Sequence, residues 1–488
     1  MNYIIQKMMI HPRLIFLLLW LGFVCGNNEA IAQNTALKAF LQSPNLKYAS
    51  VGIQITELET GKQICSHNVN MALTPASTLK LITTASALEL LGEKYLYRTS
   101  VLMDGYVDEQ GALAGNLYIQ GAGDPTLGSE YLWPDQEWFL NDWLYALQKA
   151  GITSIQGSVV AIDNLYGYEG VSPKWLWEDI GNHFASGVYG ISIFDNAYRL
   201  SLKSGAAGTQ PEILQMNPVV KNLTFNNGLV ASANTSDSAY ISGIPFSNER
   251  RIYGTIPQHK PDFTLKGDIP DPGLFLADYF TSFLQRNEVP VVGKPTTSRT
   301  EPMTTRPLKK LVTTVSKSMP EIIRVTNVRS NNHYAEYLFY TIGKEYNAEN
   351  AEYIPPVSVA AIKKYWASKG LDMKGLTMYD GSGLSPSNAV PVSLLTDLLI
   401  YMDRKSECKV LFYNSLPEAG KEGTVRSFLH QRELAGSRIK SGSISGVQSY
   451  AGYLEKDGKR YAFAIIVNRF TGNRNTLRNQ IEKLLQNF

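Results

Sequence analysis

Residues 75–92 read PASTLKLITTASALELLG. The apolar residues among them recur from Leu81 to Leu91 at spacings of three and four, which is typical of one face of a helix. Pro75 suits the first turn of such a helix, and Gly92 suits its end. The sequence therefore predicts a helix over residues 75–91, with Ser77 near its start.

Ser77 and Lys80 form an SxxK pattern within that predicted helix. Residues three apart on a helix are neighbours, so the lysine amine can lie beside the serine hydroxyl. A serine hydroxyl needs such a base, because it is a weak nucleophile at its free pKa. The pattern alone is common, since residues 406–409 and 437–440 also match it. For an isolated SxxK, a structural serine beside a solvated lysine is the competing interpretation.

Ser330-Asn331-Asn332 is an SxN pattern. Its hydroxyl can pass protons, and its amide can hold both a lysine and a substrate backbone. Residues 232–234 and 43–45 match the same pattern. Ser and Asn also favour helix N-caps, so a cap before a helix over residues 333–342 is a second interpretation, which is compatible with catalysis.

Lys440-Ser441-Gly442 is a K[ST]G pattern, which offers a cation to a terminal carboxylate and a strand edge to an extended peptide. Residues 203–205 repeat it, but they end a predicted strand in the middle of the chain, where a turn is the better interpretation. Only Ser77, Ser330 and Lys440 lie at a helix start, at a second helix start and on a strand followed by further strands. In this order the three patterns specify acyl transfer far better than any one of them.

The chain around the three patterns divides into two regions that differ in character. Residues 97–304 hold short β-like runs between turns, at 100–103, 116–120, 158–162 and 197–202, and predict a mainly β insertion with two subdomains. Residues 298–310 have the composition of the linker that leads out of it.

The two ends of the chain combine helical and strand patterns. Before the insertion we expect a short helix over residues 34–41 and a β-hairpin over 50–58 and 63–67. After it we expect helices within 320–342, 357–369 and 391–402, strands at 438–440, 450–454 and 461–467, and a last helix with apolar residues from Leu477 to Phe488. These elements predict one α/β (α+β) domain built from residues 33–96 and 305–488, with an antiparallel sheet flanked by helices.

The first 32 residues carry a compartment signal. Lys7 and Arg13 precede an apolar run over residues 14–24, and residues 30–32 read AIA, so we expect a signal peptide over 1–32 that is removed before Gln33. The run is too short for a transmembrane anchor, and the residues before Cys25 make a poor lipoprotein signal. The sequence therefore predicts an exported protein of the periplasm or cell envelope.

Composition excludes several classes of function. The formal net charge is +3 and there is no basic stripe with interleaved aromatics, so nucleic-acid binding is not expected. The mature chain keeps only Cys65 and Cys408, which do not make a disulfide framework, although their pairing is left open. Neither lies near a histidine at metal-ligand spacing and no HExxH occurs, so we expect no metal and no cofactor.

With these patterns the chain resembles the class C low-molecular-mass penicillin-binding proteins, a family of D-alanyl-D-alanine carboxypeptidases that also act as endopeptidases. The likeness covers nearly the whole mature chain, and beyond the three motifs it includes residues 115–118, 123–127, 160–163, 380–385 and 415–424. It implies a penicillin-binding, serine β-lactamase-like transpeptidase fold. A long insertion between SxxK and SxN is itself a trait of this family.

The resemblance implies a role for each motif residue. Ser77 is acylated, Lys80 removes its proton, and Ser330 with Asn332 relays protons and orders the substrate. Lys440 receives the terminal carboxylate and favours the neutral amine of Lys80.

The resemblance also implies substrate contacts by Ser441, Gly442 and Ser443, where the backbone N–H groups of Ser77 and Ser443 form an oxyanion hole. Asp163 matches an acidic position of the family that meets an amino group. The alternative, which has equal weight, is that Asp163 is only a turn residue.

The implied reaction is hydrolysis of D-Ala-D-Ala ends or D-Ala cross-links of peptidoglycan stem peptides, with β-lactams as covalent inhibitors. Pro386 and Ser445 depart from family residues that lie close to the substrate side chain, so the preferred third stem residue is not predicted. A β-lactamase-like hydrolase and a non-catalytic peptidoglycan-binding scaffold are the alternatives. Peripheral membrane association and the oligomeric state are left open.

Overall fold

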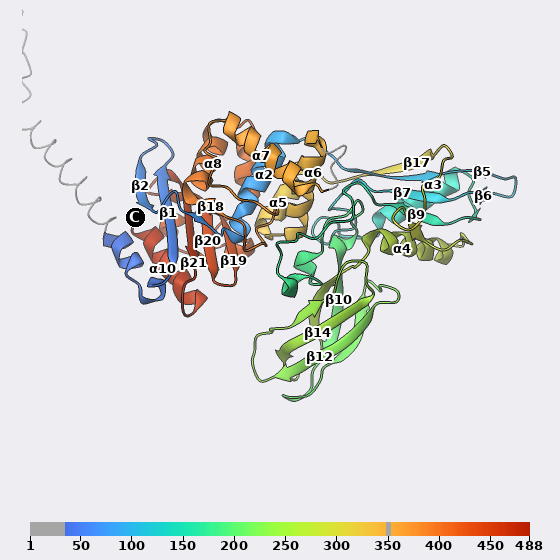
Figure 1. The fold of residues 1–488 in the computed structure, drawn as a ribbon, viewed down its shortest axis with the longest axis horizontal. Helices are drawn as coiled ribbons and strands as arrows, with labels where there is room; N and C mark the ends of the chain where they lie inside the picture. Colours follow the sequence, from blue (N-terminus) through green and yellow to red (C-terminus); the bar gives the residue numbers. More distant parts are fainter. Residues whose placement is uncertain (1–34, 348–352) are drawn as a thin grey trace, which may run out of the picture.

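The computed structural model describes residues 35–347 and 353–488. The signal peptide predicted for residues 1–32 lies outside these ranges. Figure 1 shows three bodies: one with the blue and red ends of the chain, and two formed by the middle of the chain. Within the described ranges, no helix is both long and apolar enough to cross a membrane.

The first body is built on a five-stranded antiparallel sheet that joins the two ends of the chain. Its order is β19-β20-β21-β1-β2, and the strands are Arg438–Ile444, Val447–Lys456, Lys459–Asn468, Ser50–Glu57 and Gln63–His67. The predicted hairpin and the three late strands are therefore confirmed. Gly61 at φ 73° closes the β1–β2 turn, in a backbone conformation that glycine adopts without steric cost.

Helices cover both faces of this sheet, as the sequence predicts. Helix α10 (Arg474–Gln486) packs its buried Leu477, Ile481, Leu484 and Leu485 on one face. On the other face lie α2 (Lys80–Leu90), α5 (Met319–Val328), α6 (Asn332–Asn347), α7 (Pro355–Ser368), α8 (Val392–Arg404) and α9 (Lys409–Ser415). The α/β fold with a helix-flanked antiparallel sheet is confirmed. Helix α9 was not predicted.

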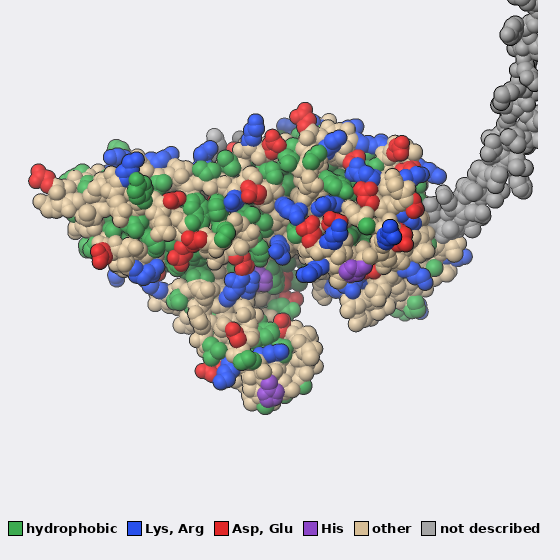
Figure 2. Space-filling model, turned by 180° about the vertical axis from the view of Figure 1, so that it is seen from behind, with side chains coloured by type: hydrophobic (Ala, Val, Ile, Leu, Met, Phe, Trp, Pro, Cys, Tyr) green, Lys and Arg blue, Asp and Glu red, His purple; other side chains and the backbone are tan. Residues whose placement is uncertain are grey.

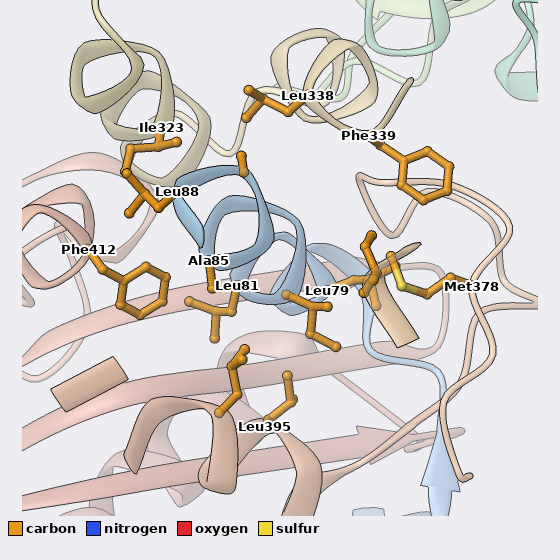
Figure 3. Close-up of a cluster of buried hydrophobic side chains, with 14 of the residues drawn as sticks. Leu79, Leu81, Ala85, Leu88, Ile323, Leu338, Phe339, Met378, Leu395 and Phe412 are labelled. Carbon is orange, nitrogen blue, oxygen red and sulfur yellow. The ribbon is translucent and has the colours of Figure 1, made fainter. Parts of the chain in front are cut away.

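Helix α2 lies at the centre of the helical layer. Leu79 and Leu81 point toward Leu395 of α8, while Leu88 lies between Ile323 of α5 and Phe412 of α9 (Figure 3). Residues 80–88 are all buried, so the helix is enclosed rather than amphipathic. The first turn of the predicted helix is a 3₁₀ turn, η2 (Ala76–Leu79), which carries Ser77.

The predicted helical stretch over residues 320–342 is two helices, α5 and α6. The chain breaks between them at residues 329–331, where Ser330 has φ 53°. A non-glycine residue in this left-handed conformation is uncommon and cannot continue a right-handed helix. The break turns Ser330 out of the helical path and toward β19.

The second body contains a five-stranded sheet, β16-β9-β7-β4-β17, whose strands are Thr296–Thr297, Val159–Ile162, Leu117–Gln120, Arg98–Met103 and Lys309–Val315. The small sheet β5-β6-β8 extends it, with strands Tyr106–Val107, Ala112–Ala114 and Ser154–Ile155. Helices α3 (Trp138–Lys149) and α4 (Pro272–Arg286) pack against these strands and were not predicted.

The third body contains two three-stranded sheets (Figure 1). One is β11-β10-β15, with strands Glu212–Asn217, Ala197–Lys203 and Phe263–Asp268, and the other is β12-β14-β13, with strands Thr224–Ser232, Glu249–Pro257 and Tyr240–Ser242.

Strand β17 pairs with β4 although it follows the predicted boundary at residue 304. We propose that the chain returns to the first body only after Val315; the division into domains stays a prediction.

Both cysteines within the described ranges are free thiols, Cys65 buried and Cys408 partly exposed. Strands β3 (Ala72–Leu73) and β18 (Val390–Pro391) form an antiparallel pair in the first body, just before η2 in the chain.

Candidate active site

Ser77 lies in the 3₁₀ turn η2, directly against strand β19. The preceding Ala76 has φ 48°, a strained conformation of the kind found at functional sites. The hydroxyls of Thr78 and Ser449 both donate to the carbonyl of Pro75, at 2.8 and 2.5 Å, and hold the turn. A Cβ on Gly442 would lie 2.8 Å from the amide nitrogen of Ser77, so only glycine permits this approach of strand and turn.

Lys80 is fully buried, and its amine Nζ makes three hydrogen bonds. It lies 2.9 Å from Ser77 Oγ, 2.7 Å from Asn332 Oδ1 and 2.7 Å from the carbonyl oxygen of Ser382. The amide oxygen and the carbonyl oxygen are acceptors only. Each must therefore receive an N–H of Lys80, and in the neutral amine the lone pair is left to face Ser77 Oγ.

Burial lowers the pKa of Lys80 to about 7, and the carboxyl groups of Glu336 and Asp380 act in the opposite direction. The neutral amine is therefore well populated near neutral pH. Desolvation is the largest cause of the lowered pKa of Lys80, and the expectation that Lys440 favours the neutral amine stays a prediction. Lys440 itself has a pKa lowered by burial first and by Lys80 second.

Lys440 of the K[ST]G pattern and Ser330 of the SxN pattern contact each other. Lys440 is fully buried on β19, and its Nζ donates to Ser330 Oγ at 2.8 Å and to the carbonyl of Ser441 at 2.7 Å. The structure thus brings together the SxxK, SxN and K[ST]G residues, which are separated by hundreds of positions in the chain.

The SxN element also caps helix α6, as its second interpretation expects, and the capping residue is Asn331. Asn331 Oδ1 accepts the backbone N–H of Tyr334, which leaves the Ser330 hydroxyl free to meet Lys440. Asn332 donates its Nδ2 to the carbonyl of Phe184 at 2.9 Å, so its Oδ1 must point toward Lys80.

Two cavities open at Ser77. The larger, of about 450 Å³, is a cleft between the first body and residues of the insertion such as Glu178, His183 and Lys266. The space-filling view shows the third body projecting below the other two beside this junction (Figure 2). The smaller, of about 280 Å³, is lined by Ser330, hydroxyl-bearing residues of β19 and Arg474 and Arg478 of α10. Ser77 and Ser443 line both, so the two cavities meet at the nucleophile position.

A sequence model of the D-Ala-D-Ala carboxypeptidase 3 (S13) family matches residues 33–488. The chain belongs to this family. It is a serine-type D-Ala-D-Ala carboxypeptidase that hydrolyses peptidoglycan peptides. The resemblance inferred from the motifs is thereby confirmed.

This carboxypeptidase is similar to known proteins over most of its length. It is 26% identical over 449 residues to the D-alanyl-D-alanine carboxypeptidase of Actinomadura sp. strain R39, covering 89% of this chain and 81% of the relative. Its fold matches penicillin binding protein 4 (dacB) of Haemophilus influenzae with a TM-score of 0.78, 22% identity, and coverage of 92% and 98% of the two chains. The complex of the same H. influenzae protein with a β-lactam matches with a TM-score of 0.74, at the same identity and coverage. The penicillin-binding fold expected for the S13 chain is confirmed.

Two buried carboxyl groups behind Lys80 were missed by the sequence analysis. Glu336 of α6 accepts the backbone N–H groups of Gly381 and Ser382, and Asp380 accepts those of Gly383 and Ser385. Burial raises the pKa of both, that of Glu336 to about 8. Asp380 is the first residue of the segment 380–385, and the likeness of that segment to the family could have indicated it. Glu336 lies within an ordinary helical pattern, so no sequence pattern indicated its role.

Of the predicted substrate contacts, Ser441 and Ser443 line the smaller cavity. The Ser441 hydroxyl donates to Thr424 Oγ1 at 2.7 Å. The two departures from the family, Pro386 and Ser445, line the cleft.

Asp163 does not join this cluster. Its side chain is 2% exposed and accepts hydrogen bonds from the hydroxyls of Tyr168 and Ser298 within the second body. Its contact with a substrate amino group stays a prediction.

Within residues 35–347 and 353–488, no group of three or more His, Cys, Asp or Glu side chains could hold a metal ion.

Proposed function

We propose that this carboxypeptidase cleaves D-Ala-D-Ala ends and D-Ala cross-links through an acyl-enzyme on Ser77, with neutral Lys80 as the general base. The observation that carries the proposal is the set of contacts around Lys80. Two acceptor-only oxygens take its N–H groups, and its lone pair faces the Ser77 hydroxyl.

In the first step, Lys80 removes the proton of Ser77 while Oγ attacks the carbonyl carbon of the penultimate D-Ala. The backbone N–H groups of Ser77 and Ser443 stabilise the oxyanion, a contribution that is large when the donors are held in place. The C–N bond breaks, and the leaving amine takes a proton that Lys80 returns directly or through Ser330, whose Oγ contacts Lys440. In the second step, water attacks the ester carbonyl while Lys80 accepts its proton. The bond between the acyl carbon and Ser77 Oγ then breaks, and Lys80 returns the proton to Oγ, which releases the acid product and restores the enzyme.

The leaving group would lie in the smaller cavity. The part that the structure describes there includes two cations, Arg474 and Arg478, and hydroxyls of Thr424 and Ser441, but no carboxylate among the lining residues. Such a lining suits the carboxylate of a departing D-Ala. Lys440 is fully buried and donates hydrogen bonds to the Ser330 hydroxyl and the Ser441 carbonyl. Its charge would therefore act mainly on the Ser330 hydroxyl.

The acyl portion of the substrate would lie in the cleft. There the insertion faces the first body, and the lining includes Pro386 and Ser445, two positions that the resemblance places close to the substrate side chain. A β-lactam would acylate Ser77 by the same step, in keeping with the complex of the H. influenzae protein. The enzyme would be exported to the periplasm or cell envelope, with residues 1–32 as its signal peptide.

The proposal is tested by incubating the purified protein with defined muropeptides and following the products by mass spectrometry. We expect loss of the terminal D-Ala and cleavage of cross-linked dimers, both abolished in Ser77→Ala. If wild type and Ser77→Ala give the same products, the assignment of the nucleophile is wrong. Rapid turnover of a chromogenic β-lactam would favour the β-lactamase alternative, and absence of labelling by a fluorescent penicillin would favour the scaffold.

A further inference from the structure

Residues 171–186 of the insertion form a segment, here named the crossing segment, that reaches the first body beside Lys80. It contains the short 3₁₀ turns η3 (Trp177–Asp179) and η4 (His183–Ala185). Its Trp175 and Ala185 are buried against Leu384 of the first body. The crossing segment is therefore packed onto the site rather than lying free at the rim of the cleft.

The crossing segment fixes the first of the two acceptors that hold Lys80. The carbonyl of Phe184 accepts Asn332 Nδ2 at 2.9 Å, and Asn332 Oδ1 accepts Lys80 Nζ at 2.7 Å. A carbonyl can only accept, so it distinguishes the two ends of the amide. Without Phe184, the amide could rotate and present its NH₂ group to Lys80.

The same segment contacts the loop that carries the second acceptor, the carbonyl of Ser382. Trp175 Nε1 donates to Asp380 Oδ2 at 2.9 Å. The hydroxyl of Ser385 donates to the carbonyl of Lys174 at 2.9 Å, and the hydroxyl of Ser172 donates to the carbonyl of Tyr379 at 3.3 Å. Both ends of the loop over residues 379–385 are thus tied to the crossing segment.

Asp380 organises the interior of that loop. Its two carboxylate oxygens accept four donors: the N–H groups of Gly383 and Ser385, the amide of Asn388 and the indole of Trp175. The indole is the one of these four donors that comes from outside the loop's own neighbourhood in the chain. Removing it leaves a buried carboxylate oxygen with one fewer partner, which is costly in a dry site.

We propose that the crossing segment positions both acceptors of Lys80, and that Trp175 is a positioning residue that acts through Asp380 and the carbonyl of Ser382. The insertion then contributes to catalysis as well as to the wall of the cleft. The inference rests on the proposed function, because it assigns Lys80 the role of base. No residue of the crossing segment was singled out by the sequence patterns.

The sign of the expected pH effect follows from the charged groups that face Lys80: Glu336 of α6, Asp380 of the loop and Lys440 of β19. Loss of the indole donor disfavours ionised Asp380, which weakens one of the two charges that raise the pKa of Lys80. Loss of the Ser382 acceptor disfavours the ammonium as well. Both changes lower the pKa of Lys80, so the acid limb of acylation moves to lower pH.

The test compares Trp175→Phe with Trp177→Phe in the full-length protein. Phenylalanine keeps an aromatic ring at position 175 but removes the indole N–H donor. Trp177, which is 69% exposed in the same segment, is the matched control. The second-order rate of acylation by a fluorescent penicillin is measured against pH, with the melting temperature of each variant. We expect Trp175→Phe to lose about tenfold in the plateau rate, as for one misplaced catalytic contact, and to shift the acid limb downward. Trp177→Phe should match wild type.

An unchanged rate and an unchanged acid limb in folded Trp175→Phe would overturn the inference. So would a rate that falls only with the folded fraction while the acid limb stays in place, because that is a purely structural effect. If Trp175→Phe does not fold, Ser385→Ala, which removes the contact with Lys174, decides by the same two readouts. Failure of wild type to form an adduct on Ser77 would instead refute the proposed function.

Discussion

The amine of Lys80 lies 2.9 Å from the hydroxyl of Ser77, and it is the neutral form of this amine that can accept the proton. Because burial lowers its pKa to about 7, the rate of acylation should rise with pH through about 7. Replacement of Lys80 by arginine keeps a cation that does not deprotonate, and should reduce acylation by about 10²- to 10⁴-fold. Stopped-flow acylation by a fluorescent penicillin measures both effects. Lys409→Arg, which changes the exposed lysine of the second SxxK pattern, is the control, and an equal loss in that variant would contradict the assignment.

The contact between Ser330 and Lys440 predicts a second effect. Ser330→Ala removes the hydroxyl that accepts Lys440 Nζ at 2.8 Å, and with it the path for protons to the leaving amine. Acylation should fall by about 10²-fold, the lower end of what a positioned proton donor contributes. Ser232→Ala tests the unrelated SxN match on β12 and should have wild-type rates. A normal rate in Ser330→Ala would show that Lys80 alone returns the proton.

The smaller cavity predicts a selective loss of substrate binding in Arg478→Gln. Arg478 lines the cavity and donates to Ser427 Oγ at 3.1 Å, and its nearest carboxylate, Glu482, is 3.8 Å away. Hydrogen bonds to charged groups contribute about 1.5–3 kcal/mol, so KM for a peptide ending in D-Ala-D-Ala should rise about tenfold or more. KM for the same peptide with a C-terminal amide should not change. An equal rise for both peptides would contradict a carboxylate contact; Lys483→Gln, further along α10, is the control.

The sequence predicted the parts of this fold that depend on local pattern. The hairpin, the three late strands, helix α2 and the order of the three motifs follow from periodicity and turn residues within short windows. The helices α3 and α4 were hidden because their apolar residues pack inside a region whose short strands and turns dominate its composition.

The rest of the site depends on contacts between distant segments. The choice of Asn331 rather than Ser330 as helix cap requires the left-handed Ser330, and no short pattern encodes that conformation. The carboxyl groups of Glu336 and Asp380 matter because the fold buries them behind Lys80, and burial is a property of the whole packing.

His333 predicts how stability depends on pH. It is buried between the hydroxyls of Ser186 and Ser192, and burial lowers its pKa to about 3 from the ordinary value of 6.5. Below pH 6.5 the unfolded chain binds a proton at this residue and the folded chain does not, so stability is full above 6.5 and falls as the pH is lowered toward about 3. The slope from this group is about 1.4 kcal/mol per pH unit. Urea unfolding of wild type and His333→Gln across this range should give a shallower dependence in the variant, and parallel curves would contradict the prediction.

Gly383 predicts a steric requirement at the nucleophile. A Cβ at this position would lie 1.9 Å from the carbonyl oxygen of Ala76, the residue before Ser77, and the backbone has φ 80°. Gly383→Ala should therefore displace either the turn that carries Ser77 or the loop that presents Ser382 to Lys80. We expect acylation to fall by about 10²-fold or more, as for an angstrom-scale misplacement of reacting groups.

Gly370→Ala separates this effect from backbone strain alone. Gly370 has φ 90° and nothing within 4 Å of an added Cβ, so its replacement should cost about 1–2 kcal/mol of stability without changing acylation. Melting temperature and acylation rate are measured on both variants. If Gly383→Ala lost stability as Gly370→Ala does but kept its rate, the close packing of the loop on Ala76 would not be needed for catalysis, and Ser382 would reach Lys80 from more than one loop conformation.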